Sequence, residues 1–353
     1  MTKIEAFLKN SIKSLGSITL KDFLNVVLYH ERFGYYSKEN IIGKKGDFIT
    51  APEISQVFGE IICYSLLLSS NKLEQTKSMS LVELGPGRGF LIQDILRTLK
   101  KLNLTLYQKI KSIFFLENYK KYLNYLKNVH TKTIIIDDIG KIPDNYNIIF
   151  ANEFFDALPV RQYIYKKKKW HEILITLNSA EKFIFSTAKE PVRINYFFPE
   201  DPVDNYTFEY SEYMINILSF ILKKIEKYGG VFFIIDYDRD TNQKDATLSS
   251  IKNHKKTGIF DDLGNCDISH SPDFSLIEKV CKNYKCSIFG PHRQSVFLQK
   301  YGINERIDYL IKKNTALSNE LLLQKERLIG KKFMGDIFKV MIITDQQQKY
   351  NFF

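Results

Sequence analysis

The chain has 353 residues, 44% of them hydrophobic, which is enough to fill one large elaborated domain or two small ones. Its net charge of +11 comes from lysines scattered through the sequence, so a solvated surface explains the charge better than a nucleic-acid partner does. No stretch approaches the ~18 to 20 apolar residues that span a bilayer, and this excludes a transmembrane helix.

The cysteines and histidines give no sign of a metal site. They show neither a Cys-x-x-Cys pair nor the spacing of metal ligands, so we expect no metal and no disulfide framework. The N-terminus lacks the apolar core of a secretory signal, and an early Glu5 argues against an organellar presequence. These features predict a soluble, cytoplasmic protein without membrane insertion.

Residues 1–75 are predicted to form an N-terminal helical region that serves as a lid. Polar and aromatic residues are dense at 34–36 and again at 46–60, ahead of the first predicted strand. Thr50 or Ser55 is expected to cap the helix that follows them. From these residues alone, an ordinary surface loop is the alternative.

An apolar strand at 81–84, which includes Glu83, runs into three glycines set two residues apart, Gly85, Gly87 and Gly89. Glycine lets a strand turn sharply with a ligand against its backbone, so the run predicts a nucleotide-binding turn before a helix. The Gly-x-Gly-x-Gly spacing favours S-adenosylmethionine over NAD, whose pyrophosphate suits Gly-x-Gly-x-x-Gly. An ordinary glycine loop is the alternative.

Strand-like and helix-like segments alternate after residue 80, which indicates a single α/β sheet. Further strands are predicted at residues 113–116, 133–136, 148–151, 231–235, 286–289 and 338–344, and helices at about 209–227 and 273–284. Five β-α repeats followed by two closing strands match the Rossmann-like, doubly wound, seven-stranded sheet of class I methyltransferases.

We therefore expect a methyltransferase domain over 76–353 with two insertions. The first, at about 160–205, begins with a β-meander, and the second, at about 302–330, is helical. Extra segments on such a sheet usually form the lid and the substrate site. The lysine run 166–169 is expected in a solvated hairpin turn, with contact to an acidic partner as the alternative.

Acidic residues stand at the ends of several predicted strands, where open α/β sheets bind their ligands. Glu117 closes the second strand, at the position where a carboxylate can bind both ribose hydroxyls. Asp137 or Asp138, after the third strand, can reach the adenine amino group in the same way. Solvated acids at strand ends are the alternative.

The fourth strand runs into Asn152-Glu153-Phe154-Phe155-Asp156, where class I methyltransferases place groups that face the methyl acceptor. We predict Asn152, Glu153 and Asp156 as catalytic residues, because the two carboxylates can orient a nitrogen donor and offset its developing positive charge. An arginine acceptor needs such pairing, since its guanidinium stays protonated. A polar loop that caps the next segment is the alternative.

These motifs together resemble the MidA-like S-adenosylmethionine-dependent methyltransferases. The match covers almost the whole chain in order, through the segments 34–36, 46–59, 83–89, 151–159, 236–237, 290–303 and 334–339. The resemblance implies a class I fold with family-specific insertions and S-adenosylmethionine as cofactor. Because the eukaryotic mitochondrial relatives are protein arginine methyltransferases needed for assembly of respiratory complex I, it also implies a complex I subunit as candidate substrate.

The chain departs from the family pattern at two places. Asp238 stands where the family usually has glycine after Asp-Tyr, so the turn that leaves the fifth strand is expected to differ. His270 lies one place earlier than the histidine of the family motif, and this puts a catalytic role for His270 in doubt.

The sequence thus predicts an S-adenosylmethionine-dependent protein arginine methyltransferase. An RNA or small-molecule methyltransferase is one alternative, although the chain shows neither a recognisable RNA-binding module nor an aromatic and basic stripe. The other is an assembly chaperone that binds a partner through its insertions and uses the cofactor only structurally.

Overall fold

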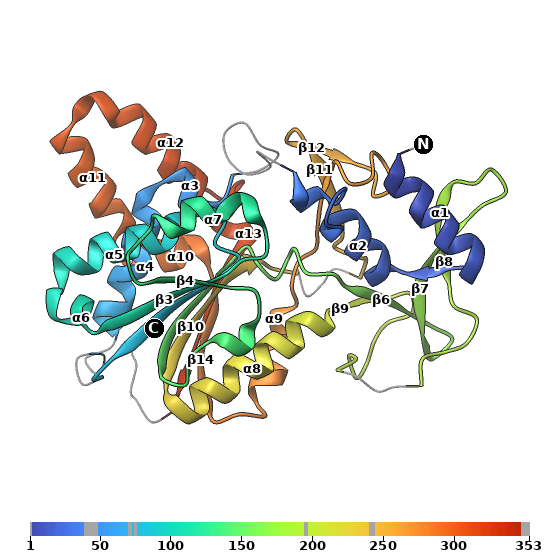
Figure 1. Ribbon diagram of the computed structural model, residues 1–353, viewed down its shortest axis with the longest axis horizontal. Helices are drawn as coiled ribbons and strands as arrows, with labels where there is room; N and C mark the ends of the chain where they lie inside the picture. The colour runs from blue at the N-terminus through green and yellow to red at the C-terminus, as the bar shows by residue number, and fades with distance from the viewer. Residues whose placement is uncertain are drawn as a thin grey trace. The chain divides into compact units, whose positions relative to one another are not determined.

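The computed structural model describes residues 2–38, 49–69, 73, 76–193, 197–239 and 244–346. Two compact units share the chain (Figure 1). One consists of Met1–Phe48, Asp156–Asn216 and Arg239–Lys279, and the other of Ile49–Phe155, Ile217–Asp238 and Val280–Phe353. We call them the meander unit and the sheet unit. The domain boundary expected between residues 75 and 76 stays a prediction.

The sheet unit is built on seven strands in the order β14-β15-β10-β5-β2-β3-β4. Their bounds are β2 (Met79–Leu84), β3 (Ile110–Leu116), β4 (Thr133–Ile136), β5 (Tyr146–Asn152), β10 (Gly230–Tyr237), β14 (Cys286–Arg293) and β15 (Phe338–Asp345). The first five along the chain pair in parallel, whereas β15 is antiparallel to both β10 and β14. This order confirms the predicted class I methyltransferase sheet.

The central strands β2, β5 and β10 are buried along nearly their whole length, which explains their continuous apolar runs. Helices of the sheet unit include α3 (Ala51–Ile54), α4 (Gln56–Ser69), α5 (Phe90–Leu102), α6 (Leu104–Gln108), α7 (Lys120–Lys127), α10 (Gln294–Lys300) and α13 (Met334–Ile337). Apolar side chains at a helical spacing on α5 are buried, as expected for a helix that packs on a sheet.

Two more helices of the sheet unit, α11 (Ile303–Lys313) and α12 (Ser318–Ile329), occupy the segment expected to be helical near the C-terminus and lie side by side (Figure 1). A buried carboxylate ties α11 to the rest of the unit. Glu60 of α4 accepts from Arg306 Nε at 2.7 Å and from Arg97 Nη2 at 3.2 Å. Arg97 also pairs with Asp94 at 2.7 Å, so one network joins α4, α5 and α11.

The meander unit contains α1 (Lys3–Leu15), α2 (Leu20–Tyr29), η1 (Tyr35–Ser37) and two small sheets. Strands β1 (Ile18–Thr19), β6 (Arg161–Lys166), β7 (Lys169–Leu177), β8 (Phe183–Thr187) and β9 (Thr207–Tyr210) form one sheet, and β11 (Ser249–Lys252), β12 (Lys255–Thr257) and β13 (Asp267–Ser269) the other. The predicted meander is confirmed as β6, β7 and β8. Lys167 and Lys168, both exposed and at φ 50° and 62°, form the expected hairpin turn.

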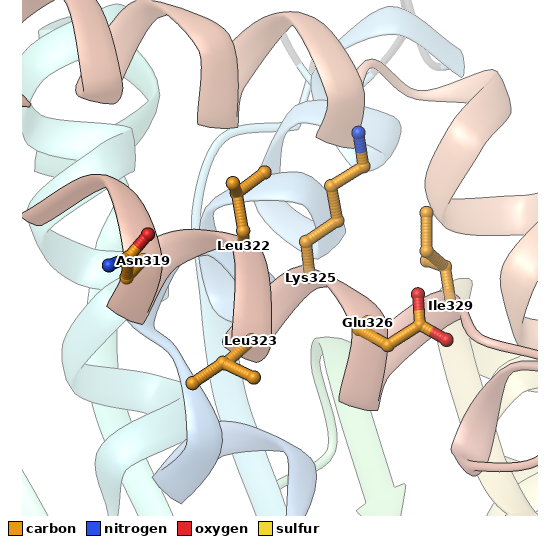
Figure 2. Close-up of a pocket in the computed structure, with 6 residues that line it drawn as sticks. All are labelled: Asn319, Leu322, Leu323, Lys325, Glu326 and Ile329. Atoms are coloured by element: carbon orange, nitrogen blue, oxygen red, sulfur yellow. The ribbon is translucent and has the colours of Figure 1, made fainter.

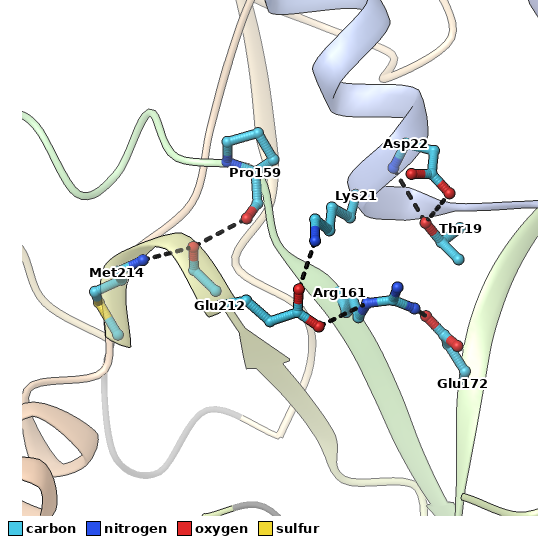
Figure 3. Close-up of polar contacts among 9 residues, drawn as sticks. Thr19, Lys21, Asp22, Pro159, Arg161, Glu172, Glu212 and Met214 are labelled. Atoms are coloured by element: carbon cyan, nitrogen blue, oxygen red, sulfur yellow. Dashed lines mark hydrogen bonds and ion pairs between the residues drawn. The ribbon is translucent and has the colours of Figure 1, made fainter. Parts of the chain in front are cut away.

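The helix predicted from residue 209 instead begins at Glu212, as α8 (Glu212–Tyr228), because Glu209 and Tyr210 belong to β9. Helix α9 (Phe274–Cys281) lies within the range predicted for it. Ser211 starts α8 by accepting from the Met214 amide at 3.3 Å while its hydroxyl donates to the Pro159 carbonyl at 3.0 Å (Figure 3). The apolar pattern of the helix runs on into the strand, so spacing alone misplaces the boundary.

Charged side chains connect α2, β6, β7 and α8 within the meander unit (Figure 3). Glu212 accepts from Lys21 Nζ at 2.5 Å and lies 3.4 Å from Arg161 Nε. Arg161 Nη1 donates to Glu172 at 2.5 Å. Burial alone lowers the pKa of Arg161, but the hydrogen bond and charge of Glu172 and the charge of Glu212 outweigh it, so the pKa of Arg161 is raised overall.

No helix in the described ranges is long and apolar enough to cross a membrane. Within those ranges, no group of three or more His, Cys, Asp and Glu side chains is placed to hold a metal ion.

Glu60→Gln should destabilise the sheet unit by roughly 1 to 3 kcal/mol, because it removes the buried charge that two arginines share. Urea unfolding followed by circular dichroism measures the change. Glu181→Gln is the matched control, since Glu181 pairs with Lys13 where both side chains are more than half exposed, and it should change stability little. Equal losses in the two variants would contradict this account of Glu60.

Candidate functional site

The glycine turn leaves β2 at the carboxyl edge of the sheet. Gly85, Gly87 and Gly89 all have positive φ, at 63°, 52° and 76°. A Cβ on Gly85 would lie 2.8 Å from the ring of Phe154, and one on Gly89 would lie 3.0 Å from a methyl group of Leu126. Only glycine meets both the backbone and the space requirement here. The turn ends at Gly89, the N-cap residue of α5.

Glu83, next to last in β2, presents a buried carboxyl group beside this turn. Its Oε2 has no hydrogen-bond partner among the described residues. Burial raises the pKa of this carboxyl well above its ordinary value, and a hydrogen bond from the Ile92 amide offsets only part of the effect. An orphaned buried oxygen fits a ligand that donates a hydrogen bond to it.

Glu117 follows β3 at the same edge of the sheet. Its Oε1 accepts from the amide of Tyr119 at 2.8 Å. Burial raises the pKa of Glu117 to about 7, although backbone hydrogen bonds from Tyr119 and Asn118 oppose the rise. The structure thus places the predicted ribose-binding acid in the expected element, and its cofactor role stays a prediction.

Asp137 and Asp138 follow β4 and are both exposed. Asp137 forms an ion pair with Lys141 at 2.5 Å, and hydrogen bonding to that ammonium lowers the pKa of Asp137. Asp138 caps the short helix η3 (Ile139–Lys141) by accepting from the Gly140 amide at 2.6 Å. Both carboxylates therefore have local contacts, and an adenine contact by either one stays a prediction.

Glu153 comes directly after β5 with its backbone in the left-handed region, at φ 51°. Its Oε1 accepts from the Ala51 amide at 3.1 Å and from Asn152 Nδ2 at 3.2 Å. Its own amide donates to the Ile235 carbonyl at 2.9 Å. The oxygen Oδ1 of Asn152 is buried without a partner within the described part of the chain. Strained backbone of this kind is held at functional sites, which supports the predicted role of Asn152 and Glu153.

The Glu153 carboxyl is strongly perturbed. Burial raises its pKa to about 8, the hydrogen bond from Ala51 opposes this, and the nearby charges of Asp236 and Glu53 raise it further. Perturbed acids at the carboxyl edge of a sheet are typical of functional sites.

Asp236 braces the same loop from β10. It is fully buried, and its Oδ2 accepts from the Phe155 amide at 2.9 Å while Oδ1 accepts from the Tyr237 amide at 2.8 Å. The loop after β5 is therefore held by one backbone carbonyl and one carboxylate of the neighbouring strand. Sequence reasoning placed Asp236 in the family-like segment 236–237 and missed its hydrogen bonds to this loop.

Asp156, the third predicted catalytic residue, belongs to the meander unit, because the chain passes from one unit to the other after Phe155. Its carbonyl accepts from the amide of His270 at 3.0 Å. Tyr36 donates to Asp267 at 3.2 Å, and its pKa is raised by burial and by the charges of Asp267 and Asp156. The segments that contain Tyr36, Asp156 and Asp267 to His270 thus lie close together in the meander unit. A joint action of Asp156 and Glu153 stays a prediction.

Sequence reasoning also missed Glu53, which it placed only within the lid segment. Glu53 lies on α3, with Oε1 at 3.7 Å from Arg88 Nη1 of the glycine turn. Burial raises the pKa of Glu53, and the Arg88 charge opposes the rise. The family-like run Thr-Ala-Pro-Glu was the signal that could have pointed to it.

The helix cap expected in this lid segment is formed by Ser55, whose Oγ accepts from the Val57 amide at 3.3 Å. Thr50 is the N-cap residue of α3 without a side-chain hydrogen bond. The segment Gly46-Asp47-Phe48 lies outside the described residues.

The departure at Asp238 has a structural consequence. Its carboxylate pairs with Lys339 of β15 at 3.4 Å, and its amide donates to the Ile337 carbonyl at 3.2 Å. An ion pair therefore joins the residue after β10 to β15, at the position where the family pattern has glycine.

A cavity of about 670 Å³ lies against α12 (Figure 2). Its lining, as far as the described residues go, consists of Asn319, Leu322, Leu323, Lys325, Glu326 and Ile329. Leu322 and Leu323 are exposed, in contrast to Leu321 and Leu328 on the buried face of the helix. No predicted site residue lines this cavity.

Comparison with known proteins agrees with this geometry. A family model of S-adenosyl-L-methionine-dependent methyltransferases matches residues 62–292. The Xenopus laevis protein arginine methyltransferase NDUFAF7, mitochondrial, is 29% identical over 374 residues, which cover 97% of this chain and 82% of that protein. The human protein of the same name is 28% identical over 376 residues, with 99% and 85% covered. The resemblance to MidA-like methyltransferases is confirmed.

A solved structure supports the fold. A COG1565 superfamily member from Burkholderia thailandensis, bound to S-adenosyl-homocysteine, superposes with a TM-score of 0.79 at 22% identity, over 97% of this chain and 91% of that one.

The prediction of a cytoplasmic protein is wrong in the light of these relatives. The Xenopus, human and Caenorhabditis elegans proteins, which match 95% of this chain or more, are all named mitochondrial. An early acidic residue was too weak a signal to decide the compartment.

The stability of the protein should fall as the pH rises from about 4.5 through 8, in part because of Glu153. Its pKa is about 8 in the folded chain against an ordinary value of 4.5, so the folded state holds the proton more tightly. This stabilising contribution is complete below about pH 4.5 and is lost as the pH rises through 8, by on the order of 1 to 4 kcal/mol.

Glu153→Gln keeps an acceptor for the Ala51 amide and cannot ionise, so its urea-unfolding free energy should fall less over this pH range than that of the wild type. Glu31→Gln, at an exposed position, is the control and should follow the wild type. Parallel pH profiles for wild type and Glu153→Gln would contradict the assignment.

Proposed function

Because this chain belongs to the family of S-adenosyl-L-methionine-dependent methyltransferases, we propose that it methylates an arginine side chain of a protein substrate. The observation that carries the proposal is the buried acid Glu153, held at the carboxyl edge of a methyltransferase sheet with Glu53 close enough to perturb it. Relatives that match nearly the whole chain are named protein arginine methyltransferases, which supports the same acceptor.

The residues of the glycine turn fit the cofactor of the family. Gly85, Gly87 and Gly89 leave backbone open for close approach, and Glu83 offers a buried oxygen that has no hydrogen-bond partner in the described ranges. Glu117 would hold the ribose hydroxyls. When bound, S-adenosyl-L-methionine supplies a methyl group made electrophilic by its sulfonium.

The chain's own part in the reaction is to bind and orient the acceptor. Glu153 and Asn152 are fixed by backbone and side-chain hydrogen bonds, so they can hold a guanidinium in one orientation. A carboxylate beside that guanidinium offsets its charge and can take the proton that a methylated nitrogen must lose. Asp156 would contribute a second carboxylate to the acceptor, as the sequence predicts.

The substrate protein that we propose is a subunit of respiratory complex I. The support is the resemblance to MidA-like methyltransferases, whose mitochondrial relatives act on such a subunit, together with the mitochondrial names of the relatives found. The chemistry at the site requires only an accessible arginine.

Incubation with methyl-labelled S-adenosyl-L-methionine and mitochondrial extract should place the label in methylarginine after acid hydrolysis of the protein fraction. A purified complex I subunit treated in the same way should gain the mass of a methyl group on arginine. Label released by ribonuclease instead of protease would sink the arginine proposal and favour an RNA methyltransferase.

Gly85→Val should reduce the rate of methyl transfer by at least about a hundredfold. The added side chain would collide with the ring of Phe154, and a backbone φ of 63° is strained for a branched residue. Gly16→Ala is the control, with φ 81° but open space around the added Cβ, and should retain activity. If complex I maturation survives Gly85→Val in cells, the chaperone alternative replaces catalysis.

A further inference from the structure

We infer that Glu53 and Glu153 together form a two-carboxylate receptor for the acceptor guanidinium, and that Glu53 selects arginine over lysine. The inference rests on the proposed function and adds Glu53 of α3 to the acceptor site.

Glu53 carries a buried charge that the described chain only partly satisfies. Its side chain is 8% exposed, and its Oε2 is buried without a hydrogen-bond partner within the described ranges. A buried carboxylate oxygen left in this state is costly, so its retention suggests a ligand that donates to it.

The two glutamates are brought together by the backbone. Glu153 accepts from the amide of Ala51, two residues before Glu53 on the same short helix, α3. The Glu53 charge is near enough to Glu153 to disfavour ionisation of its carboxyl. Like charges held close in a buried place repel one another, and a cation placed at both relieves the repulsion.

A guanidinium already lies beside Glu53. Arg88 Nη1 is 3.7 Å from Glu53 Oε1, longer than a hydrogen bond, and its side chain is 30% exposed. The Arg88 guanidinium also lies 5.9 Å from the Tyr125 ring centre. The site thus accommodates a planar cation at Oε1 while Oε2 of Glu53 is left for the acceptor.

The shape of the cation decides which acceptor fits. A guanidinium has five N–H donors in a rigid fork and can donate to two carboxylates at once, whereas a lysine ammonium is a compact point charge. Two carboxylates on different elements, α3 and the loop after β5, therefore favour arginine.

The test is isothermal titration of the full chain, with S-adenosyl-homocysteine present, against Nα-acetyl-arginine amide and Nα-acetyl-lysine amide. The wild type should bind the arginine ligand more tightly. Glu53→Gln should weaken arginine binding by about tenfold or more and narrow the difference from lysine, because a charge-assisted hydrogen bond is lost. Its affinity for S-adenosyl-homocysteine should stay within about twofold of the wild type.

A further variant separates binding from folding, and a matched control tests for indirect effects. Glu53→Asp keeps the charge but shortens the side chain, so it should show a smaller loss and covers the case in which Glu53→Gln does not fold. Glu320→Gln, on the exposed face of α12, is the matched control and should bind like the wild type.

Unchanged arginine binding in Glu53→Gln would overturn the inference, as would a wild type that binds neither ligand. The titration measures binding without methyl transfer. A methyl label found in RNA would therefore contradict the proposed function, whereas the binding data alone decide whether Glu53 contacts the arginine ligand.

Discussion

The burial of acidic groups at the carboxyl edge of the sheet is the constraint on which the site depends. Burial of each carboxylate there has a desolvation cost, and hydrogen bonds from backbone amides to the carboxylate oxygens offset part of it. The amides of Phe155 and Tyr237 hold Asp236, and that of Ala51 holds Glu153. These hydrogen bonds also fix the loop after β5, including its strained residue at φ 51°. A ligand that brings hydrogen-bond donors or positive charge would offset the remaining desolvation cost.

Buried oxygen atoms without a hydrogen-bond partner in the described ranges lie at two places along this edge of the sheet. Beside the glycine turn, Glu83 offers one buried oxygen, next to backbone that only glycine can adopt. Near the loop after β5, Glu53 and Asn152 each offer another. We propose that the first set binds the amino-acid and ribose groups of the family's cofactor and that the second binds a cationic acceptor. In this proposal the same sheet edge holds both partners of a methyl transfer.

The strands of the sheet and the glycine turn could be predicted because they depend on local sequence pattern. Continuous apolar runs identify the buried strands, and the spacing of Gly85, Gly87 and Gly89 identifies the turn. The predicted start of α8 was wrong, since Glu209 and Tyr210 directly precede the helix in the sequence but pair with β6. Glu53 and Asp236 were missed as site residues because their roles depend on contacts with Arg88 and Phe155, which are distant in sequence. The prediction of a cytoplasmic location was wrong because no property of the fold determines the compartment.

The most direct test follows the Glu153 carboxyl by NMR, with glutamate labelled at the side-chain carbon and S-adenosyl-homocysteine bound. In the absence of acceptor, this carbon should titrate near pH 8, as burial dictates. Adding Nα-acetyl-arginine amide should lower its pKa by about two units or more, because a guanidinium stabilises the ionised form. A titration that stays at the same pH with the arginine ligand bound would contradict the account, since the guanidinium would then lie away from Glu153.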